Sequence, residues 1–191
     1  MALIDLAART IHGKIVYYGP GFGGKTTNLR YIARHAPAGT RGELREIADE
    51  DGRTLFCDVL PLDLGRLLGF AVRYDLYSVP GQPPYERTRA AVLNGADGVV
   101  FVADAQAGRL ADNLRSLAEL RRQIARQGRH VDTFPLVLQY NKRDLPSALP
   151  VAALDAAVDP PPGSRFEATA ISGGGVAETL RAACKLVTAS L

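Results

Sequence analysis

A glycine-rich segment near the start of the chain carries the residue types of a phosphate-binding loop. Gly19-Pro20-Gly21-Phe22-Gly23-Gly24-Lys25-Thr26 fits the pattern GxxxxGK[ST], follows an apolar run and precedes a segment with helical spacing. In such a loop, backbone N–H groups turn inward around phosphate oxygens, the lysine neutralises the β- and γ-phosphates, and the hydroxyl group binds Mg²⁺. The alternative is a glycine-rich turn with an accidental lysine, which this strand-loop-helix setting disfavours. Lys25 is also a candidate catalytic residue, and Thr26 a candidate metal ligand. We expect contacts to the nucleotide phosphates at Gly19, Gly21, Phe22, Gly23, Gly24, Lys25, Thr26 and Thr27.

A second polar motif predicts which base is bound. Asn141-Lys142-Arg143-Asp144 directly follows an apolar run at 134–139 and fits the pattern NKxD. Its aspartate accepts hydrogen bonds from the N1–H and the exocyclic amino group of guanine, which adenine cannot offer. We expect Asn141 to brace the loop and contact the base, and the aliphatic stem of Lys142 to cover the purine face. Four such residues alone are often a polar turn, but together with the phosphate loop they predict a guanine-nucleotide site.

The elements that must position these motifs follow from the hydrophobic pattern. Short apolar runs alternate with segments of helical spacing, which is typical of βαβ units around a mostly parallel sheet. We expect six strands, at 15–18, 54–60, 70–77, 98–102 and 134–139 and near Phe166. Helices are expected at 26–35, 86–93 and 109–127, after Pro150, and at 176–189.

The predicted fold is therefore α/β, with a mostly parallel six-stranded sheet and helices on both faces. The 54–77 hairpin, turning at Pro61-Leu-Asp-Leu-Gly65, contributes one antiparallel strand, and residues 2–7 could add an extra N-terminal edge strand. The polar segment 38–53 predicts a long surface loop. A solvated face is expected on the 109–127 helix, because its arginines are interrupted by Asp112 and Glu119.

Composition bounds the class of protein. The chain has 191 residues, of which 47% are hydrophobic and 23% charged, so we expect one folded domain over residues 1–191. Its 23 cationic and 20 anionic residues nearly balance, which provides no argument for nucleic-acid binding. No apolar run approaches the roughly 18 residues of a transmembrane segment, and the start lacks the pattern of a signal peptide, so a cytoplasmic protein is expected. Two cysteines, Cys57 and Cys184, are expected to be small buried hydrophobic residues.

From about residue 10 to its end the chain resembles Ras-like small GTPases, and among them the bacterial MglA family. The resemblance rests on KIVYYGPG (14–21), GKTTNL (24–29), RTLF (53–56), PLDLG (61–65), VPGQ (79–82), DGVVFVAD (97–104) and NKRDLPSALPV (141–151). Several of these segments lie outside general nucleotide motifs, which favours this family over Ras-like or Arf-like proteins in general. The resemblance implies a Ras-like P-loop GTPase fold in a single G domain that binds GTP or GDP with Mg²⁺.

The resemblance also implies roles for further residues. Thr54 takes the place of the threonine that closes on Mg²⁺ and the γ-phosphate, and Arg53 that of an arginine finger supplied by the same chain, although a solvated loop arginine is the alternative. Gly81 would offer its N–H group to the γ-phosphate, and Gln82 would orient the attacking water. Glu167-Ala168-Thr169-Ala170 is similar to the last guanine-contact loop, with Thr169, Ala170 and Ile171 at the base. The candidate catalytic residues are thus Gln82, Arg53, Lys25 and Thr54, and the candidate metal ligands Thr26 and Thr54.

One position departs from the general Ras-like pattern. Ser78 stands where most Ras-like proteins have an aspartate that holds Mg²⁺ through a water, and the MglA family also lacks that aspartate. Tight metal binding and fast hydrolysis are both put in question. Asp75 lies three residues earlier along a strand, on the opposite face, and is not expected to be a ligand.

The resemblance implies a GTP-binding switch that hydrolyses GTP slowly and regulates motility or cell polarity, in the cytoplasm and at cell poles. Its implied partners are a Roadblock-domain homodimer of the MglB kind as activating protein, and effectors of the motility or polarity machinery. One alternative is a nucleotide-dependent binding module that barely hydrolyses GTP because of Ser78. A weaker alternative is an ATP-using P-loop protein.

Overall fold

The computed structural model describes residues 3–47 and 57–190 of the chain. In this part, eight strands form one sheet, with β1 paired to β2 and the other strands in the order β3-β4-β5-β2-β6-β7-β8. The strands are β1 (Leu3–Asp5), β2 (Thr10–Tyr18), β3 (Arg45–Ile47), β4 (Cys57–Leu67), β5 (Phe70–Ser78), β6 (Gly98–Asp104), β7 (Leu136–Asn141) and β8 (Arg165–Glu167). The α-helices are α1 (Lys25–His35), α2 (Glu86–Leu93), α3 (Leu110–Arg126), α4 (Val151–Val158) and α5 (Val176–Ala189).

The centre of the sheet is parallel and fully covered. Strands β5, β2, β6, β7 and β8 run parallel, and every residue of β6 and β7 is buried. Parallel strands are covered by helices on both faces, so their sequences are continuous apolar runs rather than alternating ones. The expected mostly parallel α/β sheet is confirmed.

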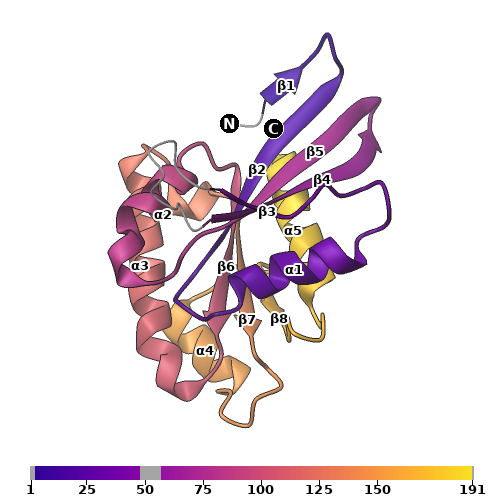
Figure 1. Ribbon diagram of the computed structural model, residues 1–191. Coiled ribbons are helices and arrows are strands. Elements are labelled where there is room, and N and C mark those ends of the chain that lie inside the picture. Colours follow the sequence, from indigo (N-terminus) through magenta and orange to yellow (C-terminus); the bar gives the residue numbers. More distant parts are fainter. Residues whose placement is uncertain (1–2, 48–56, 191) are drawn as a thin grey trace.

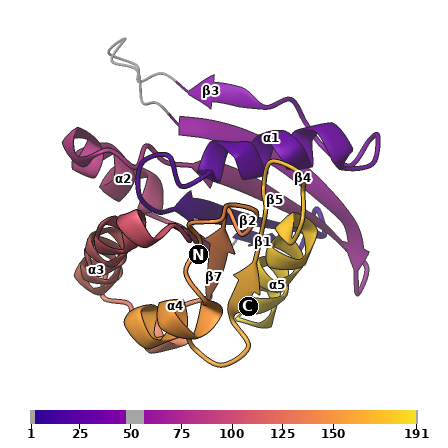
Figure 2. The same ribbon diagram turned by 90° about the horizontal axis from the view of Figure 1, so that it is seen from below.

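Helices lie on both faces of this sheet (Figure 1). On one face α1 and α5 pack over a core that includes Leu29, Tyr17 and Val187. On the other face α2, α3 and α4 cover a second core that includes Leu120 and Tyr18. Figure 2 shows the two helical layers on either side of the strands. The neighbours Tyr17 and Tyr18 point into different cores because successive side chains of a strand alternate between faces.

The edges of the sheet differ from the expectation of six strands with one antiparallel member. β1, β3 and β4 each pair antiparallel with a neighbour, so the described sheet has eight strands. β1 is the extra N-terminal strand expected within residues 2–7. β3 lies inside the segment expected to be a surface loop, where its pairing with β4 outweighs the polar composition.

The hairpin between β4 and β5 turns later than expected. Pro61-Leu-Asp-Leu-Gly65 continues as strand β4, and the chain reverses at Leu68 and Gly69, with Leu67 paired to Phe70. Leu68 and Gly69 have φ angles of 50° and 87°, as the two central residues of a tight hairpin turn require. Glycine at the second of these positions makes the later turn favourable.

Several other expectations agree with the structure. α2 and α5 have the predicted bounds, and Cys57 and Cys184 are buried free thiols. Among the described residues, no helix has the length and apolar character needed to cross a membrane.

Candidate functional site

The predicted motifs converge at the carboxyl edge of the parallel strands. The loop 19–24 connects β2 to α1, residues 79–82 follow β5, the NKRD motif begins at the last residue of β7, and residues 169–171 follow β8. Ligands of open α/β sheets bind at this edge, because the loops that leave neighbouring strands meet there. Motifs more than 100 residues apart in the chain therefore surround one site.

Local backbone geometry explains the glycines of the first loop. Gly24 precedes α1 with φ 101°, and a Cβ atom there would lie 2.1 Å from the Nδ2 atom of Asn141. Only glycine fits this position. Phe22, within this loop, has φ 64° without being glycine, and the residue is 77% exposed.

The N-terminus of α1 has backbone N–H donors and a buried cation that could bind an anion. No side chain caps the N-terminus of α1, so the first backbone N–H groups of the helix have no side-chain acceptor. The Lys25 ammonium is buried and donates to the carbonyl oxygens of Gly19 and Pro20, at 3.0 and 2.7 Å. Burial, and secondly the nearby Arg89, lower the pKa of Lys25 to about 7. Lys25 pairs with no carboxylate in the described part of the chain, so the phosphates of a nucleotide fit this end of the site.

Oxygen donors gather beside the Thr26 hydroxyl. This hydroxyl donates to Asp58 Oδ2 at 2.7 Å and lies 3.2 Å from the Ser78 hydroxyl. Asp58 and Ser78 are directly opposite each other on β4 and β5. Hydroxyl and carboxylate oxygens are the hard ligands that Mg²⁺ prefers. The donor set therefore fits this ion.

Sequence reasoning missed Asp58. Asp75, considered and set aside, lies on the other face of β5, as expected, and there it pairs with His12 Nε2 at 3.0 Å. The available signal for Asp58 was an acidic residue within an apolar strand. Only the β4–β5 register places this residue opposite Ser78.

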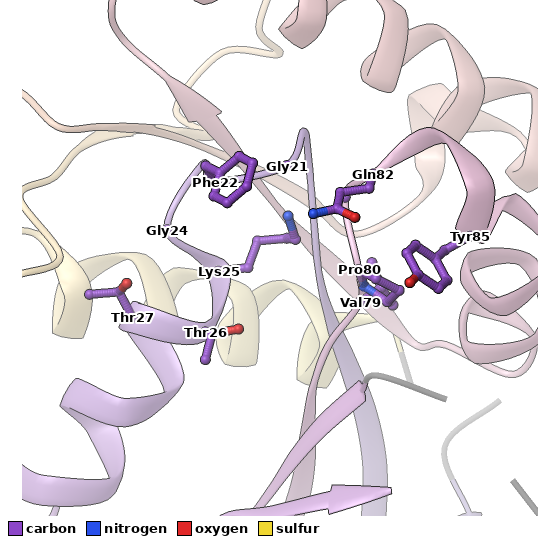
Figure 3. A pocket seen from close by; sticks show the side chains of 11 residues that line it. Gly21, Phe22, Gly24, Lys25, Thr26, Thr27, Val79, Pro80, Gln82 and Tyr85 are labelled. Atoms are coloured by element: carbon purple, nitrogen blue, oxygen red, sulfur yellow. The ribbon is translucent and has the colours of Figure 1, made fainter. Parts of the chain in front are cut away.

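The loop after β5 forms the other wall of a pocket of about 390 Å³. Lys25 and Gln82 line this pocket from opposite sides (Figure 3). Gly81 approaches the phosphate loop so closely that a Cβ atom there would lie 2.3 Å from the carbonyl carbon of Pro20. Gln82 is exposed, with its backbone at the N-terminal boundary of a 3₁₀ turn at Pro83–Tyr85. The predicted phosphate loop and the predicted hydrolytic residue therefore share one cavity.

Asn141 connects the base end of the site to the phosphate end. Its Nδ2 atom donates to the carbonyl of Gly23 at 2.8 Å, and its Oδ1 atom accepts from the N–H group of Ala170 at 2.9 Å. These bonds join the NKRD motif to both of the other predicted loops. Thr169 is bonded through its backbone to Gly174, and the side chain of Ile171 is exposed.

The remaining NKRD residues differ in their surroundings. Lys142 adopts φ 66° and its ammonium lies 2.6 Å from Oδ2 of Asp104, at the end of β6. Asp144 is exposed and makes no hydrogen bond or ion pair with the described residues. Its carboxylate is therefore available to a ligand. Thr27 lines the pocket of the phosphate loop, and the predicted catalytic residues Arg53 and Thr54 lie outside the described residues.

The long helix α3 corrects a further expectation. Arg115 and Arg122 are exposed, as predicted, but Arg109 donates through Nη2 to the Gly21 carbonyl at 2.8 Å, and Glu119 is turned inward. The expected solvated face is therefore confirmed over most of α3, where Arg121 and Arg126 are exposed as well, and is wrong at Glu119 and at Arg109, which directly precedes α3. Charge alternation along the sequence cannot distinguish a charge that faces water from one that faces a neighbouring loop.

The sheet topology, the phosphate loop and the NKRD motif at one edge define a Ras-like small GTPase. No protein-family model matches the chain. A comparison with curated proteins finds the mutual gliding-motility protein MglA of Myxococcus xanthus (strain DK1622), 48% identical over 191 residues, which cover 100% of this chain and 98% of that protein. The chain belongs to the MglA family of bacterial small GTPases. It is a GTP-binding switch that uses guanine nucleotide as its substrate.

Proposed function

We propose that residues 1–191 form a single G domain that switches a motility or cell-polarity machinery between two states by slow GTP hydrolysis. The name of the Myxococcus relative motivates the motility role. The observation that carries the nucleotide site is the pair of hydrogen bonds made by Asn141, which hold the phosphate loop and the base loop at one place. The proposed location is the cytoplasm, with recruitment to cell poles.

The proposed roles at the phosphate end follow from charge and donor geometry. Lys25 neutralises the β- and γ-phosphates, while N–H groups of the loop and the α1 N-terminus bind their oxygens. Thr26 and Thr54 hold Mg²⁺, with Asp58 as the nearby carboxylate in place of the aspartate that Ser78 replaces. The ion would neutralise charge on the phosphates.

The proposed roles at the base end use the exposed carboxylate. Asp144 accepts two hydrogen bonds from guanine, Lys142 covers the purine face, and the Ala170 N–H group lies at the guanine oxygen. Thr169 and Ile171 form the remaining wall. An adenine base would leave the Asp144 carboxylate without its partners, which disfavours ATP.

Hydrolysis is assigned to the loop after β5 and to the 53–54 segment. Gln82 orients the attacking water, Gly81 binds the γ-phosphate through its N–H group, and Arg53 stabilises charge on the transferring group. The close contact between Gly81 and Pro20 places this loop at the phosphate end of the site, where a γ-phosphate would touch it. Order of the loop that depends on the γ-phosphate would be the signal that effector proteins read, and a Roadblock-domain homodimer of the MglB kind would accelerate hydrolysis.

Single-turnover hydrolysis of GTP, with ATP as control, tests this proposal. We expect slow GTP-specific turnover that a Roadblock-domain partner accelerates, and loss of turnover with retained GTP binding in Gln82→Leu. Tight binding of GTP with no hydrolysis, alone or with the partner, would instead indicate a binding module. Equal use of ATP would contradict the roles given to Asp144 and the base loop.

A further inference from the structure

A buried arginine holds the backbone of the loop that carries Gln82. Arg89, on α2, is 4% exposed. Its Nη1 atom donates to the carbonyl oxygens of Gln82, at 2.6 Å, and Pro80, at 3.1 Å. These two carbonyls flank Gly81 on either side. The guanidinium therefore fixes the loop at the position where it faces the phosphate site.

The other edge of the Arg89 guanidinium is itself fixed by α3. Nε and Nη2 donate to the two carboxylate oxygens of Glu119, at 2.7 and 3.0 Å. Glu119 also accepts from the Tyr18 hydroxyl at 2.7 Å and from Gln123 Nε2 at 3.0 Å. Tyr18 is the last residue of β2, directly before the phosphate loop. One network thus connects the loop after β5, α2, α3 and the strand that leads into the phosphate loop.

The chemistry of this network requires an arginine. The planar guanidinium forms a two-bond fork with a carboxylate and still has an N–H group directed elsewhere, whereas a lysine ammonium is a single point charge. A buried ion pair by itself is weak evidence for a contribution to stability, because desolvation of both charges offsets their attraction. The specific feature here is that Nη1 of Arg89 also donates to the carbonyl oxygens of Pro80 and Gln82. Its effect is therefore on the position of the loop.

We infer that Arg89 is a positioning residue for GTP hydrolysis, which holds Gly81 and Gln82 in place through the two carbonyls, with Glu119 and Tyr18 holding Arg89. The inference rests on the hydrolytic role proposed for Gln82. Hydrolysis is sensitive to such positioning, since a displacement of about 1 Å can cost on the order of 100-fold in rate. Nucleotide binding is less sensitive, because most of its contacts come from loops that Arg89 does not touch.

Arg89→Lys is the direct test, because it keeps a positive charge opposite Glu119 and removes the fork. We expect single-turnover GTP hydrolysis to fall by about 10-fold or more, while the affinities for GDP and GTP, measured with fluorescent nucleotides, change less than about twofold. Hydrogen exchange of the amides of Gly81, Gln82 and Tyr85 should become faster. Arg87→Lys, an exposed arginine two residues away on α2, is the matched control and should leave all three measurements unchanged.

A double-mutant cycle with Gln82→Ala separates positioning from a general loss of structure. If Arg89 acts through the loop that carries Gln82, the rate loss caused by Arg89→Lys is smaller in the Gln82→Ala background than in the unmodified protein. Rate losses that multiply, or equal losses of hydrolysis and nucleotide affinity in Arg89→Lys, would overturn the inference. Where Arg89→Lys fails to fold, judged by one-to-one nucleotide binding, Glu119→Gln serves in the same cycle with the same expected pattern.

The cycle also distinguishes this inference from the proposed function. Slow hydrolysis in Gln82→Ala together with a normal rate in Arg89→Lys overturns the inference and leaves the role of Gln82 intact. A normal rate in Gln82→Ala removes the proposed role of Gln82, and the inference with it.

Discussion

The two halves of the candidate site are held in different ways. The half formed by the phosphate loop, the NKRD motif and the 169–171 loop is fixed by buried side chains that bond directly to loop backbone, with Asn141 at the centre. The half formed by β4 and the loop after β5 is held by charged side chains, with Asp58 accepting from the Thr26 hydroxyl and Arg89 donating to the carbonyls of Pro80 and Gln82. The first half is pre-organised to bind, and the second carries the groups proposed to hold the metal ion and to act on the γ-phosphate.

The strongest test of this difference addresses the pre-organised half. Asp144→Asn should lower the affinity for GTP on the order of 100- to 10,000-fold, because the amide offers a donor where guanine also presents donors. Xanthosine nucleotides, which carry an acceptor at that edge, should bind the variant better than GTP does. Competition against a fluorescent nucleotide measures both affinities.

Asp132→Asn, an exposed aspartate of a turn away from the motifs, is the control and should bind GTP normally. Unchanged base preference in Asp144→Asn would mean that the exposed carboxylate does not select the base.

A second test addresses the other half through Asp58. Asp58→Asn removes the charge beside the Thr26 hydroxyl, so the Mg²⁺ affinity of the nucleotide complex should fall about 10- to 100-fold. The readout is the Mg²⁺ dependence of GDP dissociation, followed by fluorescence. GDP binding in the presence of a chelator should remain as in the unmodified protein.

Asp75→Asn is the matched control, since Asp75 pairs with His12 on the other face of the strand. If both variants show the same Mg²⁺ dependence, Asp58 has no part in the metal site.

A third test uses the buried ammonium at the boundary of the two halves. Burial lowers the pKa of Lys25 to about 7, so the free protein loses this proton as the pH rises above neutrality. Bound phosphates favour the charged form and raise that pKa. Binding above pH 7 must therefore take up a proton, and GDP affinity should fall by up to about tenfold per pH unit between roughly pH 7 and 9.

Calorimetry in buffers of different ionisation enthalpy measures the proton uptake directly. Uptake approaching one proton near pH 8 is expected. Affinity and proton count that stay constant across this range would show that Lys25 remains charged in the free protein.

The smallest expected effect concerns the core beneath the pre-organised half. The Tyr17 hydroxyl is buried and has no hydrogen-bond partner among the described residues. Tyr17→Phe should raise the free energy of unfolding by about 1 kcal/mol, because it removes an unpaired polar group without creating a large cavity. Denaturant unfolding measures this change.

Tyr18→Phe, which removes the hydrogen bond to Glu119, should instead lower the free energy of unfolding. A loss of stability in Tyr17→Phe would show that its hydroxyl is satisfied in solution.

The predictability of the fold differed between its centre and its edges. Central strands and the helices α2 and α5 followed from apolar runs and helical spacing, because both signals come from burial of neighbouring residues. β3, the length of β4 and the late hairpin turn did not, since short edge strands are set by pairing with residues far along the chain. The expected solvated face of α3 was wrong at Glu119 for a related reason, because the inward direction of this side chain depends on where α2 packs.

The sequence by itself determined the phosphate loop, the base-selecting motif, their placement after core strands and membership in the MglA family. These features are local, since each depends on residue types at short fixed spacing. Only the tertiary structure placed Asp58 opposite Ser78 and Arg89 against the carbonyls of Pro80 and Gln82. The physical reason is that a strand register and the packing of one helix on another are set by the whole core, so no short segment encodes which side chain will meet a given strand or loop.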